Sequence, residues 1–484
     1  MKKRIWIILV VLSAFMLSAA TPLPHNLTLT EKAYLQNHFD EYLRSKIQTT
    51  RLSSKPTGEF YAPAEFDAAE GVFFSWKGYT NFLKQLIKFI AEDYQVYVAV
   101  SSYSQSSAKS TLENYGVNMN NVHFINANLD SIWMRDFGPD WIFTKDGDRQ
   151  VIDLVYNRPR PNDDKFPSLM AQQLGLKAFK SSLILPGGNL ILDGYGVAIM
   201  TDVVFDSSQG GDPNMSMDQL KQYMKDYFNV KKVIMIKKMN NDGTGHADMF
   251  CKLLNRNTII VGEYAKPEDG APGNYAILNE NAEKLAKETN GLGEHFKVVR
   301  IPMPPYSGGS YWGSGISYTY TNSLIINKKV LVPIYGFSTD EKALNIYRSI
   351  LPGYDVRGFD SNDIISANGS IHCISKLLMA DPLDIKFNPI TTGSAGVKIN
   401  ITAKIKAIHK LDPDNVDVYY SKSKYGPFDR VKMINTGDEY SAYIPPQTSG
   451  SKIYYYIEAE DNTGMYENVP ENAPENGVYT LSIN

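Results

Sequence analysis

A few residues of this chain have types and spacings that suggest chemistry. The chain has two cysteines, Cys251 and Cys373, and seven histidines. Cys373 could act as a nucleophile, because a thiolate attacks electrophilic carbon when a base is near. The alternative is that Cys373 is a small buried hydrophobic residue, which is the usual role of a lone cysteine. Its neighbour His372 would point to the opposite face of an extended chain, so the expected base comes from elsewhere, and His246 is the candidate.

His246 and Asp248 lie two residues apart at the start of an apolar run. Residues two apart in a strand face the same side, so both side chains are expected in one site. Cys251 would then face the packed side, which predicts a buried structural thiol. His246 could instead be a hydrogen-bonded core histidine. A disulfide between Cys251 and Cys373 is the alternative for an exported protein, but we favour two free thiols because their contexts differ.

Three segments share one pattern, which is a polar start, a short apolar strand, a turn and a second apolar strand. They begin at residues 187, 245 and 320. Helices are expected between or after them at 217–227, 279–289 and 341–351, and residues 369–373 could begin a further unit. Periodic units of this kind predict a radial α/β arrangement whose polar starts converge on one centre. Those starts contain Asn189, His246, Asp248, Asn322 and Cys373.

Other parts of the chain have different patterns. Residues 25–55 look helical, with a capping box from Thr28 to Glu31. A strand at 72–74, a helix at 81–92 and a strand at 95–100 form an expected α/β unit. After Asp381 the pattern changes to short alternating strands separated by Pro, Gly and Asn, which predicts a small β-sandwich of immunoglobulin type.

The first twenty residues are typical of a secretory signal peptide. Three basic residues at positions 2–4 precede an apolar run at 5–17, and small residues at 18–20 suggest cleavage near Ala20. We therefore expect export to the periplasm or beyond, with no membrane span in the mature protein; an uncleaved anchor is the alternative. The net charge of -3 gives no support to nucleic-acid binding. The sequence does not indicate an oligomeric state.

Seven short motifs carry a resemblance to a known family. They lie at residues 63–66, 133–139, 157–164, 187–194, 245–248, 320–323 and 371–373. Each motif is weak alone, but together they run in the family order across residues 60–380. By these motifs the chain resembles the guanidine-modifying (pentein) superfamily, in particular agmatine deiminases and the Porphyromonas-type peptidylarginine deiminase. The C-terminal sandwich also looks like the immunoglobulin-like domain of the Porphyromonas enzyme.

The resemblance implies a fold and a division of the chain. The implied fold is an α/β, five-bladed pseudo-symmetric propeller followed by an immunoglobulin-like β-sandwich. The expected division is a signal peptide at 1–20, an N-terminal helical segment at 21–58, a deiminase domain at 59–382 and the sandwich at 383–484.

The resemblance also implies catalytic roles. Cys373 would attack the guanidinium carbon, and His246 would protonate the departing ammonia and then activate water. Asp136 and Asp248 would bind the planar guanidinium by paired charge-assisted hydrogen bonds. Asp136 could instead pair with Arg135 or with another surface cation.

Further residues are implied around this centre. Asn322 would support the geometry of the site, and Trp133 would pack on the aliphatic stem of the substrate or, alternatively, belong to the core. Asn189 and Asp193 are assigned to substrate binding. No cofactor and no metal ion are expected, because no cluster of metal ligands is evident.

Arg158 and Arg160 bear on the choice of substrate. In the Porphyromonas-type enzyme the matching pair binds the carboxylate of a C-terminal arginine, which predicts an arginine-containing peptide as substrate. The alternative for the pair is a loop ion pair with Asp163 or Asp164. The residues at 243–245 are small where that enzyme has a bulky tyrosine-containing gate, which leaves substrate choice open.

Two carboxylates near Cys373 are expected to raise its pKa, so the thiolate should form mainly when a cationic substrate is bound. Agmatine or free arginine remain alternative substrates. A non-catalytic extracellular binding protein and an amidinotransferase are further alternatives. The intact set of Cys373, His246, Asp136 and Asp248 speaks against a non-catalytic role.

Overall fold

The computed structural model describes residues 22–48, 54–145, 147–306, 315–407, 410–437, 439–461, 466–470, 473–474 and 477–484. The predicted signal peptide lies outside the described residues. Within these ranges, none of the helices has both the length and the apolar character needed to span a membrane.

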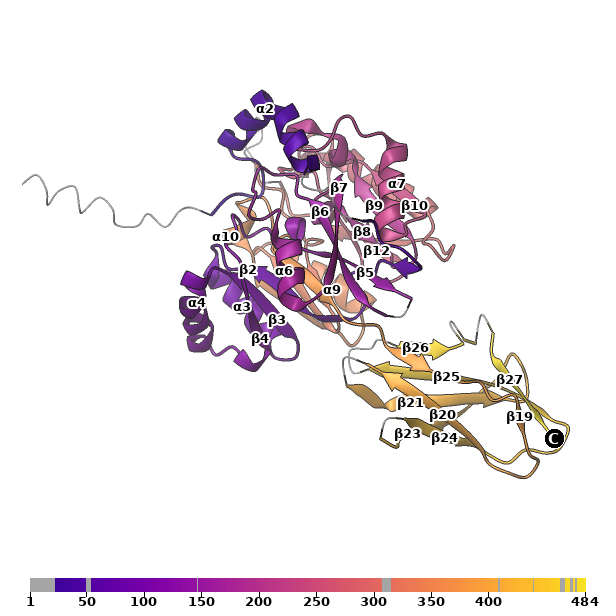
Figure 1. The fold of residues 1–484 in the computed structure, drawn as a ribbon. Helices are drawn as coiled ribbons and strands as arrows, with labels where there is room; N and C mark the ends of the chain where they lie inside the picture. Colours follow the sequence, from indigo (N-terminus) through magenta and orange to yellow (C-terminus); the bar gives the residue numbers. More distant parts are fainter. Residues whose placement is uncertain are drawn as a thin grey trace, which may run out of the picture.

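Five small sheets of one kind occupy the described chain up to Met379 (Figure 1). Each has an antiparallel strand pair and a third strand parallel to the second strand of that pair. In sheet order the strands are β17 (Ser375–Met379), β2 (Ala69–Ser75), β3 (Gln95–Val100) and β4 (Val122–Asn126); β1 (Phe60–Tyr61), β5 (Asp140–Thr144), β6 (Arg149–Val155) and β7 (Lys177–Ile184); β8 (Ile191–Leu192), β9 (Val197–Thr201) and β10 (Lys232–Ile236); β11 (Cys251–Leu253), β12 (Thr258–Glu263) and β13 (Lys297–Pro302); and β14 (Leu324–Ile326), β15 (Lys329–Ile334) and β16 (Asp355–Asp360).

A helix precedes each of these parallel third strands, because a parallel connection needs a crossover. The crossover helices are α3 (Thr80–Ile90), α6 (Phe166–Leu174), α7 (Met217–Phe228), α8 (Asn274–Lys287) and α9 (Asp340–Ile350), and α4 (Ser102–Asn114) connects β3 to β4. In α7, Ser216 and Gln219 form a capping box at the start, and Asn229 ends the helix in the left-handed conformation. The buried face of α7 comprises Leu220, Met224, Tyr227 and Phe228.

The last strand of this region, β17, pairs with β2, which lies near the start of the region. β17 lies antiparallel to β2, with Ser375 opposite Phe74 and Leu377 opposite Val72. The region therefore closes on itself, which brings the turn before β17 next to the N-terminal half of the chain. β2 is buried along almost its whole length, as expected for a strand that is covered on both faces.

The local predictions are largely confirmed. The three hairpins and their helices occur where the repeat placed them, and the predicted helix at 25–55 is α2 (Leu29–Gln48). Its capping box is present, with Thr28 N donating to Glu31 Oε2 at 2.7 Å and Glu31 N donating to Thr28 Oγ1 at 3.2 Å. Leu35, Tyr42 and Leu43 of α2 pack against the β6 and β7 strands.

Two local predictions are wrong. His246 and Asp248 are not in a strand, because residues Ala247–Met249 form a short 3-10 helix, η5, and β11 starts only at Cys251. Residues 371–374 form a turn rather than an extended segment. Gly245, with a positive φ of 71°, turns the chain just before His246, and this tight geometry replaces the expected strand alternation.

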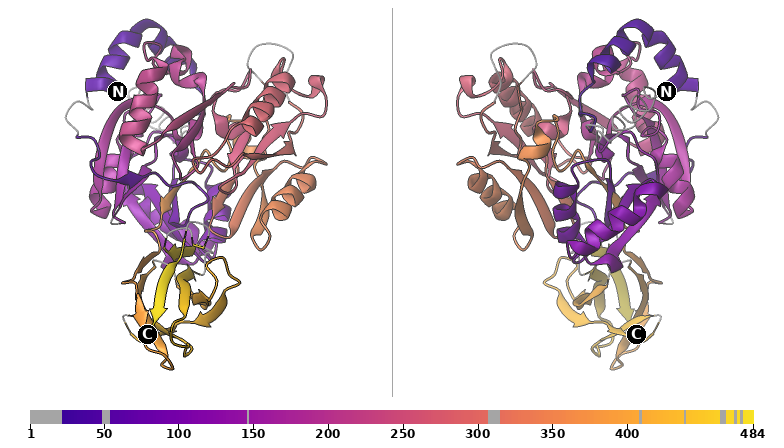
Figure 2. Two further views of the ribbon diagram at one scale, coloured as in Figure 1. Left: turned by 90° about the vertical axis from the view of Figure 1, so that its right-hand side faces the viewer. Right: turned by 90° about the vertical axis from the view of Figure 1, so that its left-hand side faces the viewer.

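Two further sheets lie at one end of the molecule, opposite α2 (Figures 1 and 2). In sheet order, the strands of the first are β18 (Asp384–Lys386), β20 (Ile399–Lys406), β24 (Tyr440–Ile444) and β23 (Ile434–Asn435). Those of the second are β19 (Thr392–Gly393), β27 (Tyr479–Ile483), β25 (Lys452–Asp461), β21 (Leu411–Ser421) and β22 (Asp429–Lys432), and β26 (Tyr466–Val469) also pairs with β25. Ile401, Val418 and Ile457 belong to a hydrophobic cluster formed within these sheets, separate from the clusters of the preceding region.

Candidate active site

Short turns at the ends of strands bring the candidate catalytic residues together. Asp136 lies on α5 (Met134–Phe137), His246 and Asp248 lie at η5, Asn322 precedes β14, and Cys373 lies in the turn before β17. A further 3-10 turn, η2 (Gly187–Asn189), contacts both α5 and η5. All five side chains are buried, with exposed fractions of 4% or less.

Gly188 marks the point on which these residues converge. A Cβ atom at this glycine would lie 2.7 Å from His246 Nδ1, 2.9 Å from Asp136 Oδ1 and 3.1 Å from Asp248 Oδ2. Its backbone N–H donates to Asp136 Oδ1 at 3.2 Å. Only a residue without a side chain permits an approach this close. The repeat therefore does bring its polar starts to one centre, as the sequence predicts.

Cys373 is held by Asn322 and faces Asp248. The Asn322 side chain donates from Nδ2 to Cys373 Sγ at 3.1 Å and accepts the Cys373 backbone N–H at Oδ1, at 3.3 Å. The thiol lies 3.8 Å from Asp248 Oδ2. Cys251 and Cys373 are both free and buried, which confirms the prediction of two free thiols. Cys251 lies in β11 and contributes to the hydrophobic core.

His372 does not contact the thiol directly but holds Asp248 in place. Its Nδ1 hydrogen-bonds to Asp248 Oδ2 at 2.6 Å, and its Nε2 hydrogen-bonds to Glu65. Glu65 also forms ion pairs with Arg135 and Lys252. Both partners of the His372 ring are carboxylate oxygens, so the ring links Asp248 to Glu65. Asp248 Oδ1 has no hydrogen-bond partner among the described residues, and it is free to accept from a ligand.

His246 lies beside Asp136 with its ring poorly satisfied. The distance from His246 Nδ1 to Asp136 Oδ1 is 3.4 Å. Neither ring nitrogen of His246 has a hydrogen-bond partner among the described residues, although the side chain is fully buried. A buried polar group without a partner is costly. An unpaired imidazole in such a position is therefore suited to bind a ligand or transfer a proton.

The electrostatics favour a neutral thiol and a neutral imidazole in this state. Burial raises the pKa of Cys373 well above its usual value, and Asp248 and Asp136 raise it further, which confirms the predicted direction. Burial lowers the pKa of His246 to about 4, against the opposing effect of Asp136. Burial alone would raise the pKa of Asp136, but His25 and His246 outweigh it, so that pKa lies below its usual value.

Trp133 is fully buried, and its ring stacks on His25. The ring centroids are 4.3 Å apart with an angle of 16° between the planes. The indole N–H of Trp133 donates to the backbone carbonyl of Leu23 at 2.9 Å. Trp133 thus belongs to the hydrophobic core, the alternative expected from the sequence, and an imidazole of the N-terminal segment packs on its ring.

The two arginines are buried but have different partners. Arg160 pairs with Glu31, donating from Nε to Oε1 at 2.8 Å and from Nη2 to Oε2 at 3.1 Å. Arg158 donates to the carbonyls of His25 at 3.3 Å and Gln209 at 2.6 Å, and its Nη2 is without a partner among the described residues. The two do not form a shared carboxylate site here, and Arg160 pairs with neither Asp163 nor Asp164 in the described contacts.

Asn189 and Asp193 have structural partners. Asn189 Oδ1 accepts from the Thr201 backbone N–H at 2.9 Å and from the Ala247 N–H at 3.3 Å, so this side chain positions η5. Asp193 accepts backbone N–H groups of the β8–β9 turn and of Gly291. Asn189 thus positions η5, and Asp193 holds the β8–β9 turn and Gly291; their assignment to substrate binding stays a prediction.

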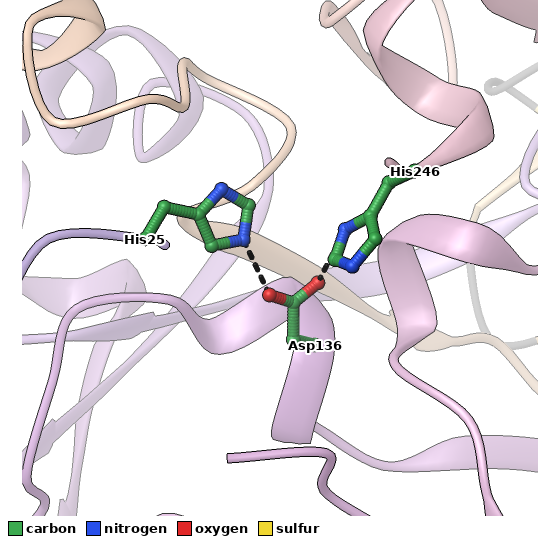
Figure 3. A group of neighbouring side chains, drawn as sticks. All are labelled: His25, Asp136 and His246. Atoms are coloured by element: carbon green, nitrogen blue, oxygen red, sulfur yellow. Dashed lines mark hydrogen bonds and ion pairs between the residues drawn. The ribbon is translucent and has the colours of Figure 1, made fainter. Parts of the chain in front are cut away.

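One group of side chains has the composition of a metal site. The donor atoms of His25, Asp136 and His246 lie within 4.8 Å of one another, and all three residues are buried (Figure 3). In the described structure His25 and Asp136 are hydrogen-bonded directly to each other. This hydrogen bond already satisfies one oxygen of Asp136 without an ion.

Two site residues have roles that sequence reasoning does not find. His25 follows the predicted signal peptide and has no motif around it, so nothing in the local sequence connects it with Asp136. Glu65 lies in the motif at residues 63–66, one of those on which the family resemblance rests. That motif marks Glu65 as a residue of interest, but it does not indicate His372 as its partner. Both contacts join residues more than 100 positions apart.

The chain is similar to known proteins over the region that contains these residues. Residues 63–378 match the family of Porphyromonas-type peptidyl-arginine deiminases. A Vibrio parahaemolyticus protein named as an agmatine deiminase is 24% identical over 369 residues, which cover 68% of this chain and 100% of that protein. A Latilactobacillus sakei protein with the same name is 24% identical and covers 69% of this chain and 100% of its own length.

Solved structures show the same fold. The agmatine deiminase of Enterococcus faecalis has a TM-score of 0.59 at 21% identity, covering 67% of this chain and 99% of its own. A Porphyromonas gingivalis structure described as an arginine deiminase has a TM-score of 0.58 at 21% identity, covering 66% and 98%. The chain therefore belongs to the Porphyromonas-type peptidyl-arginine deiminase family of pentein fold and is a deiminase-type hydrolase of amidine carbon–nitrogen bonds.

Proposed function

We propose that this protein hydrolyses a guanidinium group to a urea and ammonia, with Cys373 as the nucleophile. The observation that carries the proposal is the convergence of a thiol, two carboxylates and an unpaired imidazole beside Gly188. A planar guanidinium cation donates hydrogen bonds in a fork that matches carboxylate oxygens. Bound between Asp136 and Asp248, it would present its carbon to the thiol.

The proposed reaction has two steps. In the first, Cys373 Sγ bonds to the guanidinium carbon, and the thiol proton passes to His246. One carbon–nitrogen bond then breaks, and the leaving nitrogen takes that proton and departs as ammonia. In the second step, water gives a proton to His246 and its oxygen bonds to the same carbon. The carbon–sulfur bond breaks, which releases the urea product and restores the thiol, while the remaining proton leaves with ammonia as ammonium.

The substrate supplies the charge that this centre needs. Burial and the two carboxylates hold the pKa of Cys373 above its usual value in the free state. A cation between Asp136 and Asp248 would offset both carboxylates and favour the thiolate. The neutral His246, with its pKa of about 4, is in the form that accepts the thiol proton.

Cys373→Ala should abolish turnover, whereas Cys251→Ala is the matched control and should retain it. Ammonia release and citrulline-type product are measured with a peptide ending in arginine, a peptide with internal arginine, free arginine and agmatine. Release of product from none of these substrates by the unmodified protein would contradict the proposal. Equal loss of turnover in both cysteine variants would contradict the assignment of the nucleophile.

For the substrate, we propose a guanidine that carries a carboxylate, namely arginine at the C-terminus of a peptide. Arg158 supports this choice, because its guanidinium is fully buried with Nη2 unpaired and its described hydrogen bonds go to neutral carbonyls. A substrate carboxylate would neutralise it. Agmatine, which has no carboxylate, is the second candidate, because the relatives of Vibrio parahaemolyticus and Latilactobacillus sakei are named for it.

Arg158→Ala should separate these candidates. A hydrogen bond to a charged group contributes about 1.5–3 kcal/mol, so kcat/KM for carboxylate-bearing substrates should fall by at least about tenfold relative to agmatine. Equal effects on both kinds of substrate would count against a carboxylate at Arg158. A parental enzyme that acts on agmatine alone would exclude the peptide proposal.

We also propose that the five sheets form the five blades of a propeller, because they share one strand order. We propose that residues 383–484 form an immunoglobulin-like domain, because the sheets after Met379 have a hydrophobic cluster of their own.

We further propose that the protein is exported after cleavage near Ala20, because residues 1–20 combine basic residues with an apolar run. N-terminal sequencing of the protein from its native host would test the cleavage site.

A further inference from the structure

Residues 22–27, the N-terminal segment, enter the candidate active site. His25 is fully buried, and its imidazole lies flat on Trp133. Its Nε2 hydrogen-bonds to Asp136 Oδ2, and its ring edge meets His246 with centroids 5.3 Å apart. Figure 3 shows both histidines pointing at Asp136 from opposite sides. The His25 ring thus occupies one face of the candidate site and engages Asp136, one of the two carboxylates between which the proposed function puts the substrate guanidinium.

The chemistry of His25 imitates that of a guanidinium. Its Nε2 faces a carboxylate and its Nδ1 faces the backbone carbonyl of Asn368 at 2.9 Å, and both partners are acceptors. Each ring nitrogen of His25 thus faces an oxygen acceptor, as the N–H groups of a guanidinium would. A planar ring that engages Asp136 and stacks on an indole shares its shape and its carboxylate partner with the proposed substrate head group.

The backbone of the N-terminal segment is bound in the manner of a peptide ligand. Trp133 Nε1 donates to the Leu23 carbonyl at 2.9 Å, and Arg160 Nη2 donates to the Pro24 carbonyl at 2.9 Å. Arg158 Nε donates to the His25 carbonyl at 3.3 Å, and Arg160 Nη2 reaches the Asn26 carbonyl at 3.3 Å. Four successive carbonyls are therefore bound by three residues that the sequence assigned to the substrate.

The far side of the segment is also held. His25 N donates to the Ala367 carbonyl at 2.8 Å, and Asn368 Nδ2 donates to Asn26 Oδ1 at 3.1 Å. Beyond the segment, the Arg160–Glu31 pair fixes the start of α2. The anchor at α2 tethers the segment beside the site, so after displacement it would rebind as an intramolecular ligand.

We propose that the N-terminal segment is an intramolecular competitive inhibitor, with His25 as a pseudosubstrate that must leave before a guanidinium binds. This inference rests on the proposed function for the identity of the competing ligand. Departure of the segment removes the carbonyl acceptors of Trp133 Nε1 and Arg158 Nε, and it leaves Arg160 Nη2 with Glu31 alone. A peptide chain offers replacement carbonyls and agmatine does not, so a peptide substrate is the better competitor.

The first experiment measures access to Cys373 and does not depend on turnover. The full protein, His25→Ala and a protein beginning at residue 28 are treated with a small alkylating reagent, and modification of Cys373 is followed by peptide mass. Labelling should accelerate by at least about tenfold in both altered proteins, because access follows the population of open molecules. Cys251 provides the internal reference, and its labelling should not change.

Two controls sharpen this result. His38→Ala removes an exposed histidine of α2 and should label like the unaltered protein. A synthetic peptide of residues 22–27 should slow the labelling of the shortened protein. Equal Cys373 labelling in the unaltered protein and His25→Ala, with both folded by circular dichroism, would overturn the proposal. If the shortened protein does not fold, the His25→Ala comparison decides.

The second experiment uses turnover. His25→Ala should lower KM for a C-terminal arginine peptide and leave kcat unchanged or higher, as removal of a competitor requires. A fall in kcat with unchanged KM would instead make His25 part of the catalytic centre and overturn the inhibitor proposal. If none of the proteins turns over any guanidine, the proposed function fails, and the labelling experiment still decides whether the segment closes the site.

Discussion

The neighbouring groups distinguish the ionisable residues of the site from the same residue types elsewhere. Cys373 and Cys251 are equally buried, but only Cys373 has carboxylates and an amide donor around its sulfur. Exposure alone does not separate the two thiols, whereas their neighbours do. The neighbours also separate the two histidines. His246 is buried without a hydrogen-bond partner among the described residues, whereas the ring of His372 is held by two carboxylates.

The depressed pKa of His246 should make stability depend on pH. In the unfolded chain a histidine has a pKa of about 6.5, and in the folded protein that of His246 is about 4. The unfolded state therefore binds the proton first as pH falls. The contribution to stability is fully present above about pH 6.5 and decreases through the window down to about pH 4, by roughly 3 kcal/mol at most.

His246→Asn removes this titration, so the variant should lose less stability than the parent between pH 7 and pH 4.5. The free energy of unfolding in urea, measured at both pH values, checks this expectation. His123→Asn changes an exposed histidine of β4 and should keep the parental pH dependence. The same loss of stability in His246→Asn and in the parent would contradict the folded-state pKa of His246.

At the scale of elements, the site depends on short turns rather than on helices or strands. α5, η2 and η5 each span three or four residues and contact one another at the strand ends. Such turns can bring side chains from different sheets within hydrogen-bonding distance. Glycines permit this close approach, since a Cβ at Gly187 would collide with the Arg135 backbone oxygen. A Cβ at Gly188 would instead meet the side chains of His246, Asp136 and Asp248.

Gly188→Ala should therefore impair catalysis more than folding. The new Cβ would lie 2.7 Å from His246 Nδ1 and 2.9 Å from Asp136 Oδ1, so these groups must move. A displacement of about 1 Å can cost about 100-fold in rate, whereas overpacking typically costs about 1–3 kcal/mol of stability. We expect kcat to fall by that order while the protein stays folded.

Kinetics and thermal unfolding of Gly188→Ala test this expectation. Gly393→Ala is the matched control, because its Cβ meets only the side chains of Ile399 and Ile483 in the C-terminal sheets. That variant should retain parental turnover. Unchanged turnover in Gly188→Ala would show that the centre has more room than the structure indicates.

At the scale of the whole molecule, long-range pairing brings the parts of the site together. β17 and β2 lie about 300 positions apart in the chain and pair directly, which places Cys373 beside the turns of the N-terminal half. The segment that carries His25 reaches the same centre from the other end of the chain. The C-terminal sheets lie at one end of the molecule and α2 at the other (Figure 2).

Much of the site could be predicted from the sequence. The hairpin repeat is local, because alternating apolar residues and turn residues lie within a few positions of one another. It located the strands and placed Cys373, His246, Asp248 and Asn322 at a common centre. The argument from strand alternation was nevertheless wrong in its local structure, since both stretches are turns.

The sequence by itself identified the candidate nucleophile, the two carboxylates and the imidazole, together with the repeat that brings them together. Only the tertiary structure decided that Glu65 and His372 hold Asp248, that Glu31 pairs with Arg160, and that His25 lies on Trp133 and Asp136. The physical reason is separation along the chain. A buried charge or ring pairs with whichever residue the fold brings to it, and a pairing over more than 100 positions leaves no periodicity in the local sequence.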